Sequence, residues 1–234
     1  MEVLCDYRLG NNPRYYLGEK GDSLMLVPDE VRKCVVFICY KGDTGVKLGG
    51  TAFFVGVPGE NPDIIYPYLV TARHVIEGVK KKSIDGTVGI RINRKNQSVQ
   101  VVNTNLNDWR FHPTDDTVDV AAIQIAPSTE VYDFLYIPSS MAATEEVIVK
   151  EKIGCGDEVF LTGLFISHYG AEKNVPIIRI GNIACMPEEL VQSKELGATE
   201  AYLVEARSIG GLSGSPVFVH LSGIRGGKLN LGVE

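Results

Sequence analysis

The chain has 234 residues, of which 44% are hydrophobic and 22% are charged, and its formal net charge at pH 7 is −6. This length and apolar content allow one large domain or two small ones, each with a real core. The negative charge disfavours non-specific attraction to nucleic acid or to an anionic membrane. No apolar stretch approaches the roughly 20 residues that span a bilayer. We therefore expect a soluble globular protein that binds neither nucleic acid nor membrane.

The N-terminus and the cysteines indicate a compartment. The chain begins without a basic region followed by an apolar run, so no secretory signal is visible. The cysteines are odd in number and form no Cys-x-x-Cys pair, which indicates buried or partly buried free thiols and neither a disulfide frame nor a zinc site. We expect a cytoplasmic protein whose free cysteines are Cys5, Cys34, Cys39, Cys155 and Cys185.

The first half of the chain is strand-like after a poorly patterned beginning. Residues 1–30 contain turn signals without clear periodicity, and we predict an extension that lies on the main domain. From Cys34 onward, short β-branched and aromatic runs alternate with glycine-containing turns. Trp109 is expected to anchor a loop over the first group of strands. These predicted strands are 35–40, 51–57, 66–71, 88–92, 99–102 and 118–125.

A basic cluster falls within this first group of strands. Lys80, Lys81 and Lys82, with Arg91, Arg94 and Lys95 nearby, have the composition of a phosphate-binding patch. They flank Asp85-Gly86, a dipeptide typical of hairpin turns. We therefore interpret the cluster as a solvated turn.

The second half repeats the strand-like pattern. A less regular, partly helical connection is expected over 132–149. Many short strands at close spacing, with little helix, predict an all-β protein built as barrels or a sandwich. The predicted strands of this half are 158–165, 176–185, 202–205, 216–221 and 229–231.

Ser213 stands in the segment Gly-Leu-Ser-Gly-Ser-Pro, residues 211–216. A serine between glycines predicts a tight turn in which the backbone can point two N–H groups at one place beside the hydroxyl. The same composition is typical of an ordinary surface loop. An activated serine also needs a general base and a group that orients this base.

Two residues could supply these groups. His74 lies at the end of a buried-looking strand, where a polar ring needs a partner, although it could also be a structural histidine. Asp119 directly precedes an apolar strand, so its carboxylate would lie near the core, and an imidazole N–H is its natural partner. Asp115 and Asp116 compete for this role but fall in a polar turn, where we expect them to be solvated.

Four segments together resemble the motif set of trypsin-like serine peptidases, and most closely the bacterial HtrA-like and glutamyl-endopeptidase-like branch. They are residues 49–55, 71–75, 119–121 and 211–216, and their order His, Asp, Ser is that of the chymotrypsin type. The resemblance implies an all-β fold of two antiparallel β-barrels. The first barrel would span 31–130, and the connection and second barrel would span 131–234.

The resemblance also implies a role for each site residue. Ser213 would be the nucleophile, His74 the general base and acid, and Asp119 the group that fixes the imidazole tautomer. The backbone N–H groups of Gly211 and Ser213 would form the oxyanion hole. The substrate would be a polypeptide bound in extended form, hydrolysed by a serine endopeptidase without a cofactor or metal. Consistent with this, the other histidines show no ligand spacing: His112, His168 and His220.

The chain departs from the family pattern at Leu212, in lacking the cysteines that flank the histidine motif in secreted relatives, and in the few residues that follow Ser213. Leu212 replaces the Asp that pairs with a newly cut N-terminus in zymogen-type enzymes, so that route of activation is not expected. Arg207 falls where relatives place the base of the specificity pocket, which would favour an acidic substrate side chain, or it points to solvent or pairs with Glu205. The chain ends soon after Ser213, so we expect an incomplete second barrel. This leaves two other interpretations open: an inactive binding or sensor module, truncated from a larger protein, and an esterase or acyl-transferase using the same triad.

Overall fold

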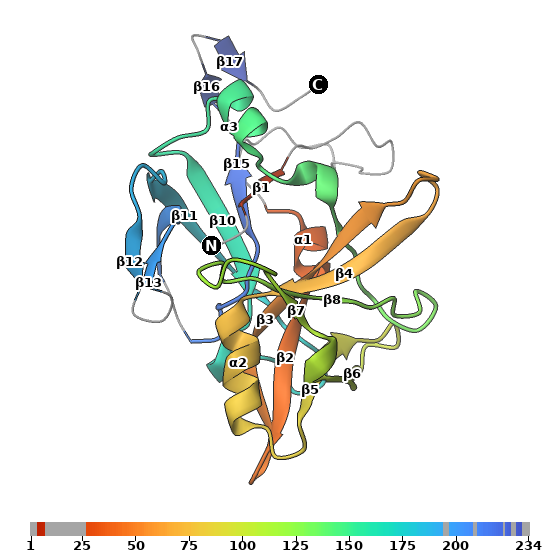
Figure 1. The fold of residues 1–234 in the computed structure, drawn as a ribbon. Helices are drawn as coiled ribbons and strands as arrows, with labels where there is room; N and C mark the ends of the chain where they lie inside the picture. Colours follow the sequence, from red (N-terminus) through yellow and green to blue (C-terminus); the bar gives the residue numbers. More distant parts are fainter. Residues whose placement is uncertain are drawn as a thin grey trace.

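The computed structural model describes residues 4–7, 27–193, 197–207, 210–221, 223–225 and 228–230. Most of the predicted N-terminal extension, residues 1–3 and 8–26, lies outside these ranges. The described residues form two large β-sheets that pack against each other, two small hairpins, and few and short helices (Figure 1). The predicted all-β class is confirmed. In the described ranges no strand pairing closes either sheet into a continuous barrel.

The first sheet has the strand order β6-β5-β2-β3-β4-β8-β7, with β9 added to β3. Neighbouring strands are antiparallel except β9, which runs parallel to β3. All six strands predicted for this half are present. The bounds of the strands are β2 Val35–Gly42, β3 Gly45–Pro58, β4 Ile65–Thr71, β5 Thr87–Asn93, β6 Val99–Asn105, β7 Arg110–Phe111, β8 Ala121–Gln124 and β9 Ile137–Pro138.

The second sheet has the order β1-β15-β10-β11-β14. Its members are antiparallel except β1, which pairs parallel to β15 with Leu4 opposite Val217. Part of the predicted extension is therefore an edge strand of this sheet. Two small hairpins, β12–β13 and β16–β17, accompany it. The bounds are β1 Leu4–Tyr7, β10 Glu158–Gly163, β11 Ile177–Cys185, β12 Val191–Ser193, β13 Gly197–Thr199, β14 Leu203–Ala206, β15 Val217–His220, β16 Gly223–Arg225 and β17 Lys228–Asn230.

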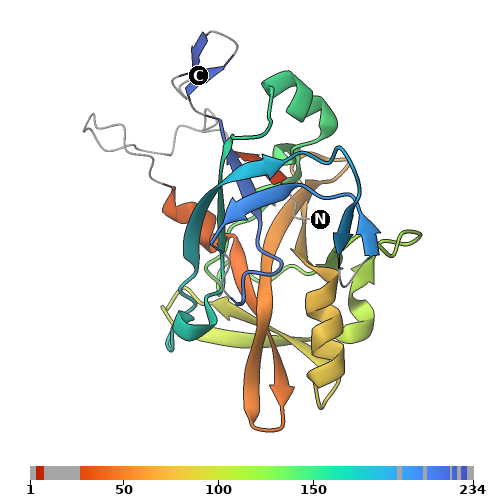
Figure 2. The same ribbon diagram turned by 90° about the vertical axis from the view of Figure 1, so that its left-hand side faces the viewer.

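Helix α2, Arg73–Lys82, corrects one interpretation of the sequence. Lys80, Lys81 and Lys82 were predicted to lie in a hairpin turn, and this prediction is wrong. They form the last turn of this helix. Val75, Ile76 and Val79 are all buried, because their spacing places them on one helical face against β2 and β3 (Figure 2). The remaining helices are short: α1 Asp29–Lys33, α3 Glu145–Glu151, and the 3-10 turns η1 Leu106–Asp108, η2 Ser139–Met141 and η3 Ile166–His168.

The core joins the two sheets. Phe53 of β3 belongs to the same buried cluster as Phe160 of β10 and Phe218 of β15. The rings of Phe160 and Phe218 stack with centroids 4.9 Å apart. Because this cluster contains residues of both sheets, it fixes one sheet against the other, so loops from both halves can share one site. Trp109 is buried in the core of the first sheet and donates from Nε1 to Thr104 Oγ1 at 3.1 Å, which confirms its predicted anchoring role.

The cysteines in the described part of the chain are free. Cys34 and Cys39 are buried, and burial raises the pKa of their thiols to about 12 and about 11. Cys155 is exposed, contrary to the expectation of burial, because it lies in the turn before β10. No helix in the ranges described above is long and apolar enough to cross a membrane.

Candidate active site

The register of the first sheet brings His74 and Asp119 together. Strand β8 runs antiparallel to β4, and Thr71 lies opposite Ala121. Continuing this register past Thr71 places the residues just after β4 beside those just before β8. His74, in the first turn of α2, therefore meets Asp119, two residues before β8.

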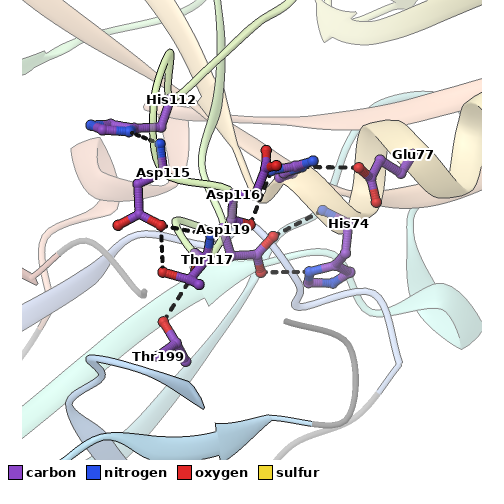
Figure 3. A network of polar contacts seen from close by, with 9 residues as sticks. His74, Glu77, His112, Asp115, Asp116, Thr117, Asp119 and Thr199 are labelled. Carbon is purple, nitrogen blue, oxygen red and sulfur yellow. Dashed lines mark hydrogen bonds and ion pairs between the residues drawn. The ribbon is translucent and has the colours of Figure 1, made fainter. Parts of the chain in front are cut away.

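Asp119 receives two hydrogen bonds from His74 (Figure 3). Its Oδ2 lies 2.6 Å from the ring Nδ1, and its Oδ1 accepts from the backbone N–H at 2.9 Å. Both carboxylate oxygens are thus engaged by one residue, which fixes the ring orientation. Asp119 is buried, with 9% of its surface exposed. The His74 side chain is 34% exposed and is therefore accessible to a ligand.

The environment keeps Asp119 ionised. Burial raises the pKa of this carboxyl, but the hydrogen bonds from the His74 ring and backbone N–H outweigh burial, so its pKa lies below the ordinary value of 3.8. A lowered pKa means that the folded state prefers the carboxylate. Asp119 is therefore a permanent hydrogen-bond acceptor for Nδ1 near neutral pH.

This lowered pKa predicts a pH-dependent contribution to stability. Because the pKa of Asp119 is lower in the folded than in the unfolded chain, its contribution is present above 3.8 and is lost as pH falls through the folded value. Urea unfolding of wild type and Asp119→Asn at several pH values should show a difference in free energy of unfolding that shrinks as pH falls below about 4. A difference that stays constant down to pH 3 would contradict this assignment.

The loop before Asp119 is fastened to α2. Arg73 donates to Glu77 at 2.9 Å and to the Asp116 side chain at 2.8 Å, and it also reaches the Asp116 carbonyl at 3.0 Å (Figure 3). Asp115 accepts from the N–H and hydroxyl of Thr117 and closes a local turn. Asp115 and Asp116 are exposed, as predicted, so neither replaces Asp119.

The same loop contacts the second half of the chain. Thr199 of β13 donates its hydroxyl to the Thr117 carbonyl at 3.1 Å (Figure 3). Thr199 is buried at this contact. The hairpin β12–β13 therefore supports the loop that carries Asp119, a connection that links residues far apart in the sequence.

Ser213 lies in a tight turn, as predicted. Gly211 has φ +107° and Gly214 has φ +83°, a backbone region that L side chains rarely adopt. A side chain at Gly214 would also collide with the carbonyl oxygen of Thr51. The turn therefore requires glycine on both sides of Ser213, and the serine itself is exposed.

Thr51 fastens this turn to the first sheet. Its N–H donates to the Ser213 carbonyl at 2.9 Å, and its hydroxyl donates to the Gly211 carbonyl at 2.8 Å. The same hydroxyl accepts from the N–H of Leu164 at 2.8 Å. Thr51 is fully buried, so no water molecule could take the place of a partner if one of these hydrogen bonds were lost. No role for Thr51 was predicted from the sequence, although a hydroxyl inside the apolar run 51–55 was an available signal.

The two backbone N–H groups predicted for an oxyanion hole are those of Gly211 and Ser213. Among the described residues, the N–H groups of Gly211 and Ser213 have no hydrogen-bond acceptor. The Gly210 carbonyl accepts from the N–H of Ile166 at 3.4 Å. Because carbonyl and N–H point in opposite directions across a trans peptide, this contact turns the Gly211 N–H away from η3.

His74, Asp119 and Ser213 line one cavity of about 110 Å³. The buried hydroxyl of Ser215, another lining residue, has no hydrogen-bond partner within the described ranges. Arg207 does not line this cavity. It is exposed and directly follows β14. No group of three or more metal-ligating side chains occurs among the residues described here.

Comparisons with known proteins identify the fold. No family model matches the sequence, and a search of curated proteins finds no match. Among solved structures, the chain is similar to the apo MamO protease domain from Magnetospirillum magneticum, with TM-score 0.51, 15% identity, and 81% of this chain and 79% of that chain covered. Deg5 gives TM-score 0.49 at 15% identity, with 80% and 75% covered. The Drosophila Grass clip serine protease of the Toll pathway gives TM-score 0.44 at 13% identity, with 88% and 70% covered.

At 15% sequence identity, structural similarity is evidence for the fold alone. The chain has the chymotrypsin-like fold of trypsin-like protease domains, which confirms the fold implied by the sequence motifs.

Proposed function

We propose that this protein is a serine endopeptidase that uses Ser213, His74 and Asp119 as a catalytic triad. The observation that carries the proposal is the doubly hydrogen-bonded His74–Asp119 pair in the same cavity as an exposed serine on a glycine turn. A structural histidine would need only one partner and no neighbouring serine. The fold adds support, because the similar MamO domain is a protease domain by its description.

The pair sets the direction of proton transfer. Ionised Asp119 accepts the Nδ1 proton of His74, so Nε2 is the nitrogen that can take a proton. In the proposed reaction, Nε2 accepts the Ser213 hydroxyl proton as Oγ attacks the peptide carbonyl. The imidazolium then gives this proton to the leaving amine as the C–N bond breaks, leaving an acyl-enzyme. A water molecule deprotonated by Nε2 hydrolyses the ester and restores Ser213.

The turn around Ser213 would stabilise the charge that forms on the substrate. The N–H groups of Gly211 and Ser213 lack acceptors among the described residues, so both can donate to an oxyanion. Such donors act through fixed geometry, and the loss of one typically costs about 10²–10³ in rate. Thr51 holds the turn that carries both donors, because it binds the carbonyls of Gly211 and Ser213.

The substrate would bind in extended form along β14. This strand is the last of its sheet in the part of the chain that the structure describes, so its edge can accept another strand. Arg207 follows β14 directly and is exposed. A peptide at this edge would pass close to Arg207, which supports a preference for an acidic substrate side chain.

Labelling with a fluorophosphonate tests the proposed activity. The probe should add one phosphonyl group to the wild-type protein, seen by intact mass, and none to Ser213→Ala or His74→Ala. Ser140→Ala and His168→Ala serve as matched controls, because both residues lie at the surface outside the cavity and should label normally. A folded wild-type protein that takes up no label would overturn the proposal and favour a binding module.

A further inference from the structure

A second cavity, of about 250 Å³, lies between the first sheet and the segment before β11. It shares no residue with the cavity of His74. Its lining comes from four parts of the chain: the last turn of α1, the end of β5 with the turn after it, Asp133, and the segment leading to β11. These residues are Arg32, Lys33, Asn93, Arg94, Gln97, Asp133, Lys173, Asn174 and Val175.

The lining is cationic in a protein of negative net charge. Four basic side chains face one carboxylate, a local charge of +3, whereas the whole chain carries −6. Lys33 pairs with this carboxylate, with its Nζ 3.0 Å from Asp133 Oδ1. Lys173 contacts a neutral group, the Gln97 amide oxygen, at 3.0 Å. The charges of Arg94 and Lys173 therefore meet no carboxylate within this lining.

Arg94 lacks a partner in this lining. Its Nε is buried and has no hydrogen-bond acceptor among the described residues, and its guanidinium forms no ion pair with any of them. A buried donor without an acceptor destabilises the folded state, and more so when it is charged. A group that enters the cavity with acceptor oxygens would remove this destabilisation.

The walls of the cavity are built by hydrogen bonds. Asn174 is buried, donates from its backbone to Asn93 Oδ1 at 2.6 Å and accepts at its carbonyl from Asn93 Nδ2 at 3.2 Å. Its side chain bonds both the guanidinium and the carbonyl of Arg91. Arg91, which the sequence analysis placed in a solvated turn, is in fact buried and donates to the carbonyls of Gly170 and Ala171. The position of Lys173 relative to Arg94 is therefore fixed by a rigid junction.

We propose that this cavity binds a small inorganic oxyanion such as phosphate or pyrophosphate. Guanidinium groups bind such oxygens with charge-assisted, often paired hydrogen bonds, which Arg94 can supply. The volume exceeds the roughly 30 Å³ share of one water molecule several times, so an ion with several oxygens fits. The ligand would join α1 and the first sheet to the segment before β11.

Isothermal titration of the full chain with sodium pyrophosphate, phosphate and acetate at constant ionic strength tests the site. Pyrophosphate should bind with one saturable site, phosphate more weakly, and acetate least. Arg94→Gln and Lys173→Gln should each weaken pyrophosphate binding about tenfold, the effect of about 1.4 kcal/mol per lost contact. Lys173 is exposed, so its substitution leaves the fold intact.

Lys80→Gln with Lys81→Gln is the matched control, since these exposed lysines lie on α2 outside the cavity. The control should bind pyrophosphate like wild type. The proposal is overturned by the absence of saturable binding, or by equal weakening in the control and in Lys173→Gln. Because the measurement is binding and not hydrolysis, it is independent of the proposed peptidase activity.

Discussion

Asp119→Asn is expected to lower the rate of fluorophosphonate labelling by about 10⁴ while the protein stays folded. The asparagine oxygen can still accept from the His74 backbone N–H, which holds the local structure. Its amide group would face Nδ1 with a donor, so the ring would carry its proton on Nε2. The ring would then no longer accept the Ser213 proton, and the positive charge that forms on it would lose the carboxylate.

Labelling rate against probe concentration, with circular dichroism as a check on folding, measures this effect. Asp108→Asn is the control, because this exposed aspartate lies in η1 outside the cavity and should label at the wild-type rate. A rate within tenfold of wild type for Asp119→Asn would mean that the carboxylate charge is not used.

Thr51→Val should both destabilise the protein and slow labelling. Valine has nearly the same shape but leaves the Leu164 N–H and the Gly211 carbonyl without their partner. Each buried unsatisfied group costs about 1–3 kcal/mol, so the free energy of unfolding should fall by about 2–6 kcal/mol. Because Thr51 also holds the turn that carries the two predicted oxyanion donors, labelling should slow by about 10².

Thr51→Ser is the matched control, because it keeps the hydroxyl and removes only a methyl group. It should cost about 1 kcal/mol and label at nearly the wild-type rate. Urea unfolding and labelling kinetics of the two variants distinguish the effect of losing the hydroxyl from the effect of losing the methyl group. Equal losses in both variants would show that Thr51 acts through packing alone.

Much of the fold could be predicted from local patterns. The strands of both sheets follow β-branched and aromatic runs between turn residues, and these preferences act within a few residues. The glycine turn around Ser213 was also predictable, because the positive φ of Gly211 and Gly214 is a local backbone conformation that favours glycine. The pairing of Asp119 with His74 was expected from a carboxylate before a buried strand, and the register of β4 with β8 produces it.

Helix α2 could not be read in the same way. Val75, Ile76 and Val79 fit the buried face of a helix, but a short apolar run continuing from β4 also fits the end of a strand. What decides between them is the surface of β2 and β3, on which the helix packs (Figure 2).

The amino-acid sequence by itself determined the strands, the glycine turn at Ser213 and the residue types of the candidate triad, because each depends on neighbours in the chain. Only the tertiary structure decided the role of Thr51, the parallel pairing of β1 with β15, and the basic cavity around Arg94. These features join segments separated by most of the chain, and such contacts depend on how the two sheets pack, which no local preference encodes.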